Sequence, residues 1–154
     1  FNIVTFASLH QGYHVLVHWL QGSLGIQGPA LDALRTYVNA YLGTQYNAVL
    51  VNRYKNGNDF ISDHSDNERG LDAAAGVVTI SYGQTRTFRI KRRADAPIGA
   101  ATFKNGRMDV ELTHNSILVM EGPGFQRSYT HGVPKRASSN GVRYSFTFRR
   151  HVPN

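Results

Sequence analysis

The segment His64-Ser65-Asp66 carries an imidazole and a carboxylate two residues apart, a spacing that suits metal coordination. If the segment is extended, residues i and i+2 point to the same side, so both side chains can reach one point. Two histidines and one carboxylate on one face of an octahedron leave three positions open, as in non-haem Fe(II) oxygenases. The segment therefore predicts two of three iron ligands, with a polar surface turn as the alternative.

The third ligand has to be a histidine that is remote in sequence. The other histidines are His10, His14, His18, His114, His131 and His151. Among them, His131 lies in the run YTHGVP, just past a loop with two glycines, and twelve residues before Arg143. Spacing alone leaves the choice among these histidines open.

A pair of arginines could hold an organic anion. Arg143 and Arg149 are six residues apart in RYSFTFR, a predicted strand, so they share one face, opposite Phe146 and Phe148. An arginine buried on a strand is costly unless an anion meets it, and a dicarboxylate would do so through bidentate hydrogen bonds. The alternation does not decide whether this polar face lines a pocket or contacts water.

The elements that must position these residues are mainly short strands. Pro29–Leu42 has apolar residues at helical spacing, begins with proline and precedes Gly43, so it predicts a helix. Turns at Gly83-Gln84-Thr85 and Asn105-Gly106 predict hairpins. The pattern predicts a mostly β fold with an N-terminal helix and a double-stranded β-helix (jelly-roll) core. The predicted strands are Phe1–Leu9, Tyr13–Leu20, Ala48–Tyr54, Val77–Tyr82, Thr87–Ile90, Thr102–Phe103, Met108–Leu112, Ser116–Met120 and Arg143–Arg149.

Composition limits the classes of protein that fit. The 154 residues suggest one domain, and the absence of cysteine excludes disulfides, thiolate metal sites and cysteine nucleophiles. A net charge of +7 favours a polyanionic partner, with nucleic acid ahead of a membrane surface. No apolar run approaches the ~18 residues of a membrane-spanning helix.

Positive charge is concentrated after the Gly83 turn. Five basic residues fall within eight positions, and four more follow; a solvated loop is the alternative to phosphate binding. They are Arg86, Arg89, Lys91, Arg92 and Arg93, then Lys104, Arg107, Lys135 and Arg136.

Several blocks, in this order, resemble the AlkB family of Fe(II)- and 2-oxoglutarate-dependent dioxygenases. They are Asn52-Arg53-Tyr54, His64-Ser65-Asp66-Asn67-Glu68, Val77–Gly83 with Thr87-Phe88, Met120-Glu121-Gly122 with His131–Pro134, and Arg143–Arg149. Gln11-Gly12-Tyr13 is similar to a family element beside the substrate. The resemblance implies one domain over residues 1–154, with residues 1–45 on the substrate side and residues 46–150 as the catalytic jelly roll.

The resemblance also implies a role for individual residues. His64, Asp66 and His131 would hold Fe(II) and form the catalytic centre. Arg143 would pair with the distal carboxylate of 2-oxoglutarate, and Arg149 would lie near the other carboxylate. The remaining co-substrate residues would be Asn52, Tyr54 and Ser145, and the substrate-side residues Tyr13, Asn67, Glu68, Ser81 and Arg92.

The implied activity is the oxidative removal of N-alkyl groups from nucleic-acid bases, with O2 as oxidant and the base out of its stack. The short region before Asn47 predicts an open site that suits single-stranded RNA or DNA. The chain also resembles compact AlkB-like modules in replicases of plant RNA viruses, which implies a cytoplasmic location and RNA as the preferred substrate. The absence of an initial Met is consistent with excision from such a polyprotein. A monomer is a separate expectation. The alternatives are a 2-oxoglutarate oxygenase acting on protein, lipid or a small molecule, and a non-catalytic nucleic-acid-binding jelly roll.

Overall fold

The computed structural model describes residues 29–152. The strands expected at Phe1–Leu9 and Tyr13–Leu20, and with them Tyr13, lie outside the described residues. Helix α2 spans Pro29–Leu42, as the apolar spacing predicted. No helix in the described part of the chain is both long and apolar enough to span a lipid bilayer.

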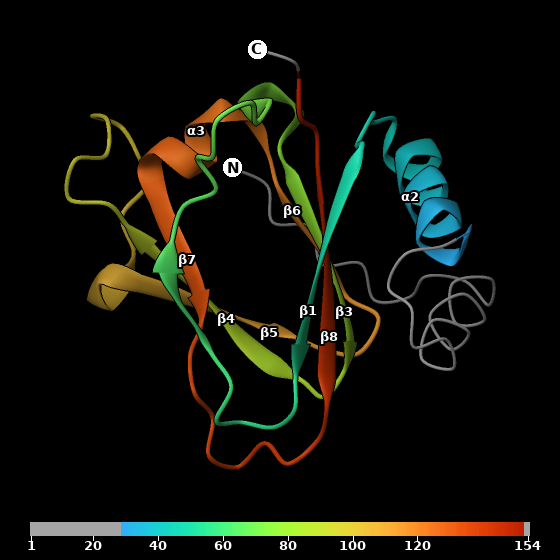
Figure 1. Ribbon diagram of the computed structural model, residues 1–154. Coiled ribbons are helices and arrows are strands. Elements are labelled where there is room, and N and C mark those ends of the chain that lie inside the picture. The colour runs from blue at the N-terminus through green and yellow to red at the C-terminus, as the bar shows by residue number, and fades with distance from the viewer. Residues whose placement is uncertain (1–28, 153–154) are drawn as a thin grey trace.

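Within residues 29–152, eight strands form two four-stranded antiparallel sheets that face each other (Figure 1). The strand order is β1-β8-β3-β6 in the first sheet and β2-β7-β4-β5 in the second. This arrangement confirms the predicted jelly roll. The strands are β1 (Ala48–Tyr54), β2 (Ile61–His64), β3 (Val77–Gly83), β4 (Arg86–Arg92), β5 (Arg107–Leu112), β6 (Ile117–Met120), β7 (Tyr129–Val133) and β8 (Arg143–Arg149).

Three short helical segments complete the fold. The helix α3 (Gly122–Ser128) joins β6 to β7, and its neighbour in space is the 3₁₀ turn η1 (Ala73–Ala75). The second 3₁₀ turn, η2 (Lys104–Gly106), leads into β5. α3 therefore caps one end of the space between the sheets (Figure 1).

Helix α2 covers the outer face of the first sheet (Figure 1). Its buried residues Leu34 and Val38 pack in one cluster with Ile80, Phe146 and Phe148 from β3 and β8. Burial of each such side chain contributes about 1.5–3 kcal/mol. Successive residues of a strand point to opposite faces. The β8 residues that alternate with Phe146 and Phe148 therefore point into the space between the sheets.

The turn Gly83-Gln84-Thr85 does not form the predicted hairpin. β3 pairs with β6 and β8, whereas β4 pairs with β5 and β7, so this turn carries the chain from one sheet to the other. Gly83 has φ +97°, and a Cβ there would lie 2.3 Å from the Val142 carbonyl oxygen. That same oxygen accepts a hydrogen bond from the Gln84 amide, which fixes the crossing.

Two further expectations about strands were wrong. Thr102–Phe103 is not a strand, and Asn105-Gly106 is a turn that leads into β5, with Asn105 at φ 63°. β5 instead pairs with β4 across the long intervening loop. β2 and β7 were not predicted as strands, because ISDH and YTHGV lack the alternation of a strand with one apolar face.

Candidate active site

Strands β2 and β7 bring two histidines together. In this antiparallel pair, His64 stands opposite His131, and Asp66 follows two residues after the end of β2. The Nε2 atom of His64 lies 3.8 Å from Asp66 Oδ1, and the Nε2 atom of His131 lies 3.5 Å from Asp66 Oδ2. One ligand atom from each of the three residues falls within 4.8 Å of the others. The structure thus brings together the three residues that the sequence singled out.

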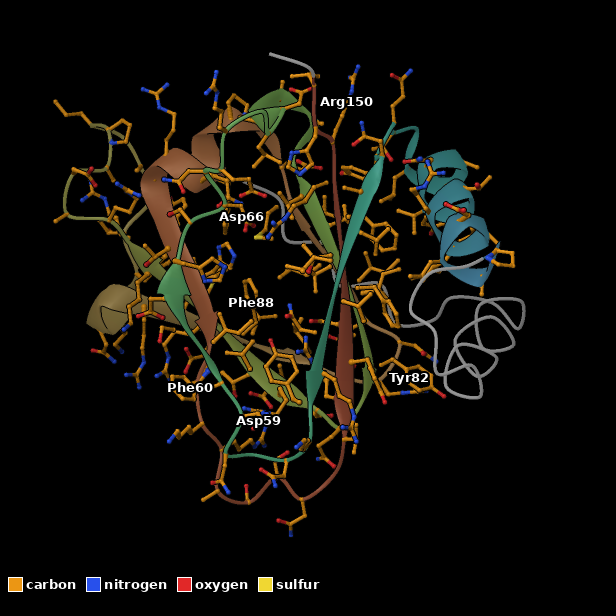
Figure 2. All side chains as sticks on the ribbon, in the orientation of Figure 1. Asp59, Phe60, Asp66, Tyr82, Phe88 and Arg150 are labelled. Atoms are coloured by element: carbon orange, nitrogen blue, oxygen red, sulfur yellow. The ribbon has the colours of Figure 1, made fainter. Side chains whose placement is uncertain are left out.

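Neighbouring groups fix how each of the three side chains is oriented. His64 Nδ1 lies 2.9 Å from the Ser62 carbonyl oxygen, which can only accept, so Nδ1 carries the hydrogen and Nε2 keeps its lone pair. The ring of Phe88 stacks on His131, with centroids 5.2 Å apart. The Asp66 amide donates to Gln126 Oε1 at 2.8 Å. Figure 2 shows Asp66 and Phe88 between the two sheets.

The electrostatics of the site suit a divalent cation. Burial lowers the pKa of His131 to about 3, helped by the nearby charges of His64 and Arg149, so its imidazole is neutral and can bind a metal. Burial also raises the pKa of Asp66, against the opposing effect of Arg149. Asp66 Oδ2 is buried with no hydrogen-bond partner among the described residues. Such an orphaned carboxylate oxygen, in a cluster with two imidazoles, fits Fe(II), which takes nitrogen and carboxylate ligands.

Arg149 holds the carboxylate of Asp66 from the side of β8. Its Nη2 donates to Asp66 Oδ1, and its Nη1 donates to Glu68 Oε1 at 2.6 Å. One guanidinium therefore anchors both Asp66 and Glu68. This leaves Asp66 Oδ2, which lies 3.5 Å from His131 Nε2, as the carboxylate oxygen with no hydrogen-bond partner among the described residues.

The other end of the same pocket is built around Arg143. This side chain is 1% exposed, and its Nη2 donates to Ser81 Oγ at 2.7 Å. Its Nε and Nη1 are buried with no hydrogen-bond partner in the described part of the chain. Burial lowers the pKa of the guanidinium, whose Cζ lies 4.9 Å from the centre of the Tyr54 ring. Two unsatisfied donors of a buried cation fit a carboxylate.

The polar face of β8 is a pocket wall, which answers the question that alternation left open. The pocket is lined by Arg143, Ser145, Thr147 and Arg149 of β8 and also by all three residues of the metal cluster. Asn52 and Tyr54 of β1 line it too. The sequence placed Thr147 on the polar face of the strand by its i+2 periodicity but gave it no role, and it gave no signal for Thr79 or Gln126.

Ser81 differs from its predicted place on the substrate side. It is 2% exposed and bonded to Arg143, so it belongs to the buried end of the pocket. Arg92 is directed at the loop after β4, where its Nη2 donates to the carbonyl oxygens of Ala96 and Pro97. Asn67 and Glu68 are exposed beside the metal cluster, which is compatible with the predicted substrate contact.

The basic cluster after Gly83 is largely neutralised by internal pairing. Arg86 is 1% exposed, so it cannot meet a phosphate at the surface. Arg89 pairs with Asp109, Lys91 with Asp63, Arg93 with Asp95 and Arg136 with Glu111. The carboxylates that pair with these cations are dispersed in the sequence and meet them only in the fold. The net positive charge of this surface is therefore lower than the run of basic residues predicted.

Comparison with known proteins agrees with this geometry. Residues 18–149 match the family model described as the 2OG-Fe(II) oxygenase superfamily. The chain is 31% identical over 135 residues to "DNA oxidative demethylase ALKBH2" of Arabidopsis thaliana, covering 79% of this chain and 43% of that protein. It is 31% identical over 126 residues to human "Alpha-ketoglutarate-dependent dioxygenase alkB homolog 3", covering 82% and 44%.

A solved structure supports the fold. A Pseudomonas putida prolyl-4-hydroxylase superposes with a TM-score of 0.53 at 17% identity, over 99% of this chain and 87% of that one. At this identity the likeness concerns the fold alone. The chain spans less than half the length of the two AlkB-type relatives above, so their activities do not transfer directly to it.

Proposed function

Since the chain belongs to the 2OG-Fe(II) oxygenase superfamily, we propose that it removes N-alkyl groups oxidatively from nucleic-acid bases. His64, Asp66 and His131 would hold Fe(II), and Arg143 would hold the distal carboxylate of 2-oxoglutarate. The observation that carries this proposal is one pocket that contains both a three-residue metal cluster and a buried arginine with two unsatisfied donors.

When bound, Fe(II) and 2-oxoglutarate supply the oxidant: one atom of O2 enters 2-oxoglutarate, which gives succinate and CO2, and the other hydroxylates the substrate. The hydroxyl group on that carbon then loses its proton as the carbon–nitrogen bond breaks, so the carbon leaves as an aldehyde and the bonding electron pair stays on the base nitrogen. The protein contributes position and electrostatics. Arg149 keeps Asp66 oriented, and Phe88, Met120 and Val133 keep the pocket wall apolar beside the cluster.

Three observations support a nucleic-acid substrate. The relatives that the chain resembles include proteins named DNA oxidative demethylases. The net charge is +7. Among the described residues, several basic side chains have no carboxylate in ion-pair contact and are free to meet phosphates; they are Arg53, Lys55, Arg69, Lys104, Arg127 and Lys135.

We further propose that the substrate is single-stranded. The His64 side chain is 41% exposed, so the metal cluster is open to solvent on the side of β2 within the described structure. A base that is already unstacked reaches such a site without the few kcal/mol of unpairing that a duplex base requires. RNA and DNA strands both meet this condition.

The test is a panel of N-methylated oligonucleotides, single-stranded and duplex, RNA and DNA, incubated with Fe(II), 2-oxoglutarate and O2. Mass spectrometry should show loss of the methyl group, with single strands turned over fastest, and His131→Ala should be inactive. His114→Ala, which changes a histidine outside the pocket, is the matched control and should retain activity.

Two results would count against the proposal. Succinate production that no methylated oligonucleotide stimulates would indicate an oxygenase for another substrate class. A wild type that binds the oligonucleotides without demethylating them, together with unchanged binding by His131→Ala, would indicate a non-catalytic binding module.

A further inference from the structure

Two buried guanidinium groups share one aromatic ring at the closed end of the pocket. The Cζ of Arg86 lies 5.4 Å from the centre of the Tyr54 ring, and that of Arg143 lies 4.9 Å from it. Both arginines are 1% exposed. Neither forms an ion pair with a carboxylate of residues 29–152. Two cations in a poorly hydrated space are costly unless an anion joins them.

Arg86 binds backbone only. Its Nη1 donates to the Asn56 carbonyl at 3.0 Å, and its Nη2 donates to the carbonyls of Asp59 and Pro134 at 2.7 and 2.8 Å. Asn56 and Asp59 belong to the β1–β2 connection, at the lower end of the fold in Figure 2, and Pro134 follows β7. These carbonyls accept from Nη1 and Nη2, whereas Nε is buried with no hydrogen-bond partner among the described residues, and carbonyl dipoles do not cancel the unit charge of the guanidinium.

Arg143 lines the pocket and Arg86 does not. Tyr54, whose ring both guanidiniums approach, is itself a lining residue. Any effect of Arg86 on the pocket therefore passes through its charge or through the position of Tyr54. Burial lowers the pKa of the Arg86 guanidinium while Tyr54 and Asp59 raise it, and an arginine remains charged at neutral pH.

We propose that Arg86 is a specificity-determining residue, which selects a dianionic 2-oxo acid over a monoanionic one. Its positive charge adds to that of Arg143 where the distal carboxylate of the co-substrate would lie. The inference rests on the proposed function, in which 2-oxoglutarate is the co-substrate. It assigns a role in co-substrate selection to a residue that does not contact the co-substrate. A unit charge roughly 10 Å away at an effective dielectric constant near 20 changes affinity on the order of tenfold.

The test compares two ligands that differ only in the distal group, 2-oxoglutarate and 2-oxopentanoate, which has a methyl in place of the carboxylate. Calorimetric titration into protein loaded with Mn(II), without turnover, gives both affinities. Arg86→Gln should weaken 2-oxoglutarate on the order of tenfold and leave 2-oxopentanoate nearly unchanged. Arg86→Lys, which keeps the charge, should retain most of the preference for the dicarboxylate.

Arg89→Gln is the matched control. It removes an arginine from the same strand, but one paired with Asp109 and partly exposed, so both affinities should stay at the wild-type values. A purely structural role of Arg86 would weaken both ligands equally in Arg86→Gln. That result, or no change in either affinity, would overturn the inference.

Should Arg86→Gln fail to fold, Asp59→Asn provides the second variant. The Asp59 carboxylate opposes the charge of Arg86, so its removal should raise the preference for 2-oxoglutarate a fewfold, and an unchanged or lower preference would overturn the inference. The wild type separates the two proposals: if it does not bind 2-oxoglutarate, the proposed function fails. If it binds and Arg86→Gln keeps the preference, only the role of Arg86 fails.

Discussion

Replacement of Arg143 by methionine should have opposite effects on co-substrate binding and on the stability of the empty protein. Methionine roughly keeps the length of the side chain and removes its charge. In the wild type the guanidinium is 1% exposed, and two of its nitrogens have no partner. The empty protein therefore carries the cost of a buried cation that only its bond to Ser81 and its contact with Tyr54 offset.

The expected magnitudes follow from these contacts. Two charge-assisted hydrogen bonds to a carboxylate contribute about 1.5–3 kcal/mol each, so their loss weakens 2-oxoglutarate binding roughly 10²–10⁴-fold. Replacing an unpaired buried charge by an apolar side chain is neutral or stabilising by about 1–4 kcal/mol. The free energy of unfolding of the empty variant should thus equal or exceed that of the wild type.

The assay pairs calorimetric titration of 2-oxoglutarate into Mn(II)-loaded protein with urea unfolding of metal-free protein. Arg127→Met, at an exposed arginine of α3 outside the pocket, is the control and should change neither quantity. The reasoning is refuted if Arg143→Met binds 2-oxoglutarate within threefold of wild type. It is also refuted if the empty variant unfolds at a much lower urea concentration than the wild type. The internal contacts of Arg143 would then stabilise the empty protein by more than the burial of its charge destabilises it.

Three further predictions concern the metal cluster and the core. Asp66→Asn keeps the shape of the side chain but removes its charge, and should weaken Mn(II) binding roughly 100-fold or more in a titration followed by electron paramagnetic resonance. Gly132→Ala would place a Cβ 2.8 Å from the Ile61 carbonyl oxygen. This contact would force β2 and β7 apart, so the free energy of unfolding in urea should fall by about 1–3 kcal/mol and metal binding should weaken. Burial raises the pKa of Tyr46 from 10.0 to about 12, so the neutral phenol is favoured in the folded state and the free energy of unfolding should fall by roughly 2 kcal/mol between pH 10 and pH 12. Tyr46→Phe, which loses the bond to the Ala75 carbonyl, should be about 1 kcal/mol less stable at pH 8 but lack this alkaline loss; parallel stability curves for the two proteins would contradict the assignment.

Parts of the fold with a regular apolar pattern could be predicted from the sequence. The helix Pro29–Leu42 and the strand Arg143–Arg149 have the bounds that periodicity indicated, because each has one apolar face that packs in the same core. The strands β2 and β7 have no such face. They are defined by pairing with each other, which depends on residues more than sixty positions away.

The metal cluster and the co-substrate arginine could be predicted only because several motifs occurred in a fixed order. Local chemistry alone left six candidate third histidines. The pairing of the basic cluster could not be predicted, because Asp63, Asp109 and Glu111 reach those cations only through the sheet. The buried position of Arg86 was missed for the same reason: its three carbonyl partners come from two loops that meet only in the fold.

Anomalous diffraction from a crystal grown with Mn(II) and 2-oxoglutarate, without turnover, tests the central claim most directly. The account predicts a single strong peak within about 2.5 Å of His64 Nε2, His131 Nε2 and Asp66 Oδ2. It also predicts that the distal carboxylate of the co-substrate lies against the Nε and Nη1 atoms of Arg143. A metal peak away from these three atoms, or a co-substrate carboxylate that does not touch Arg143, would contradict it.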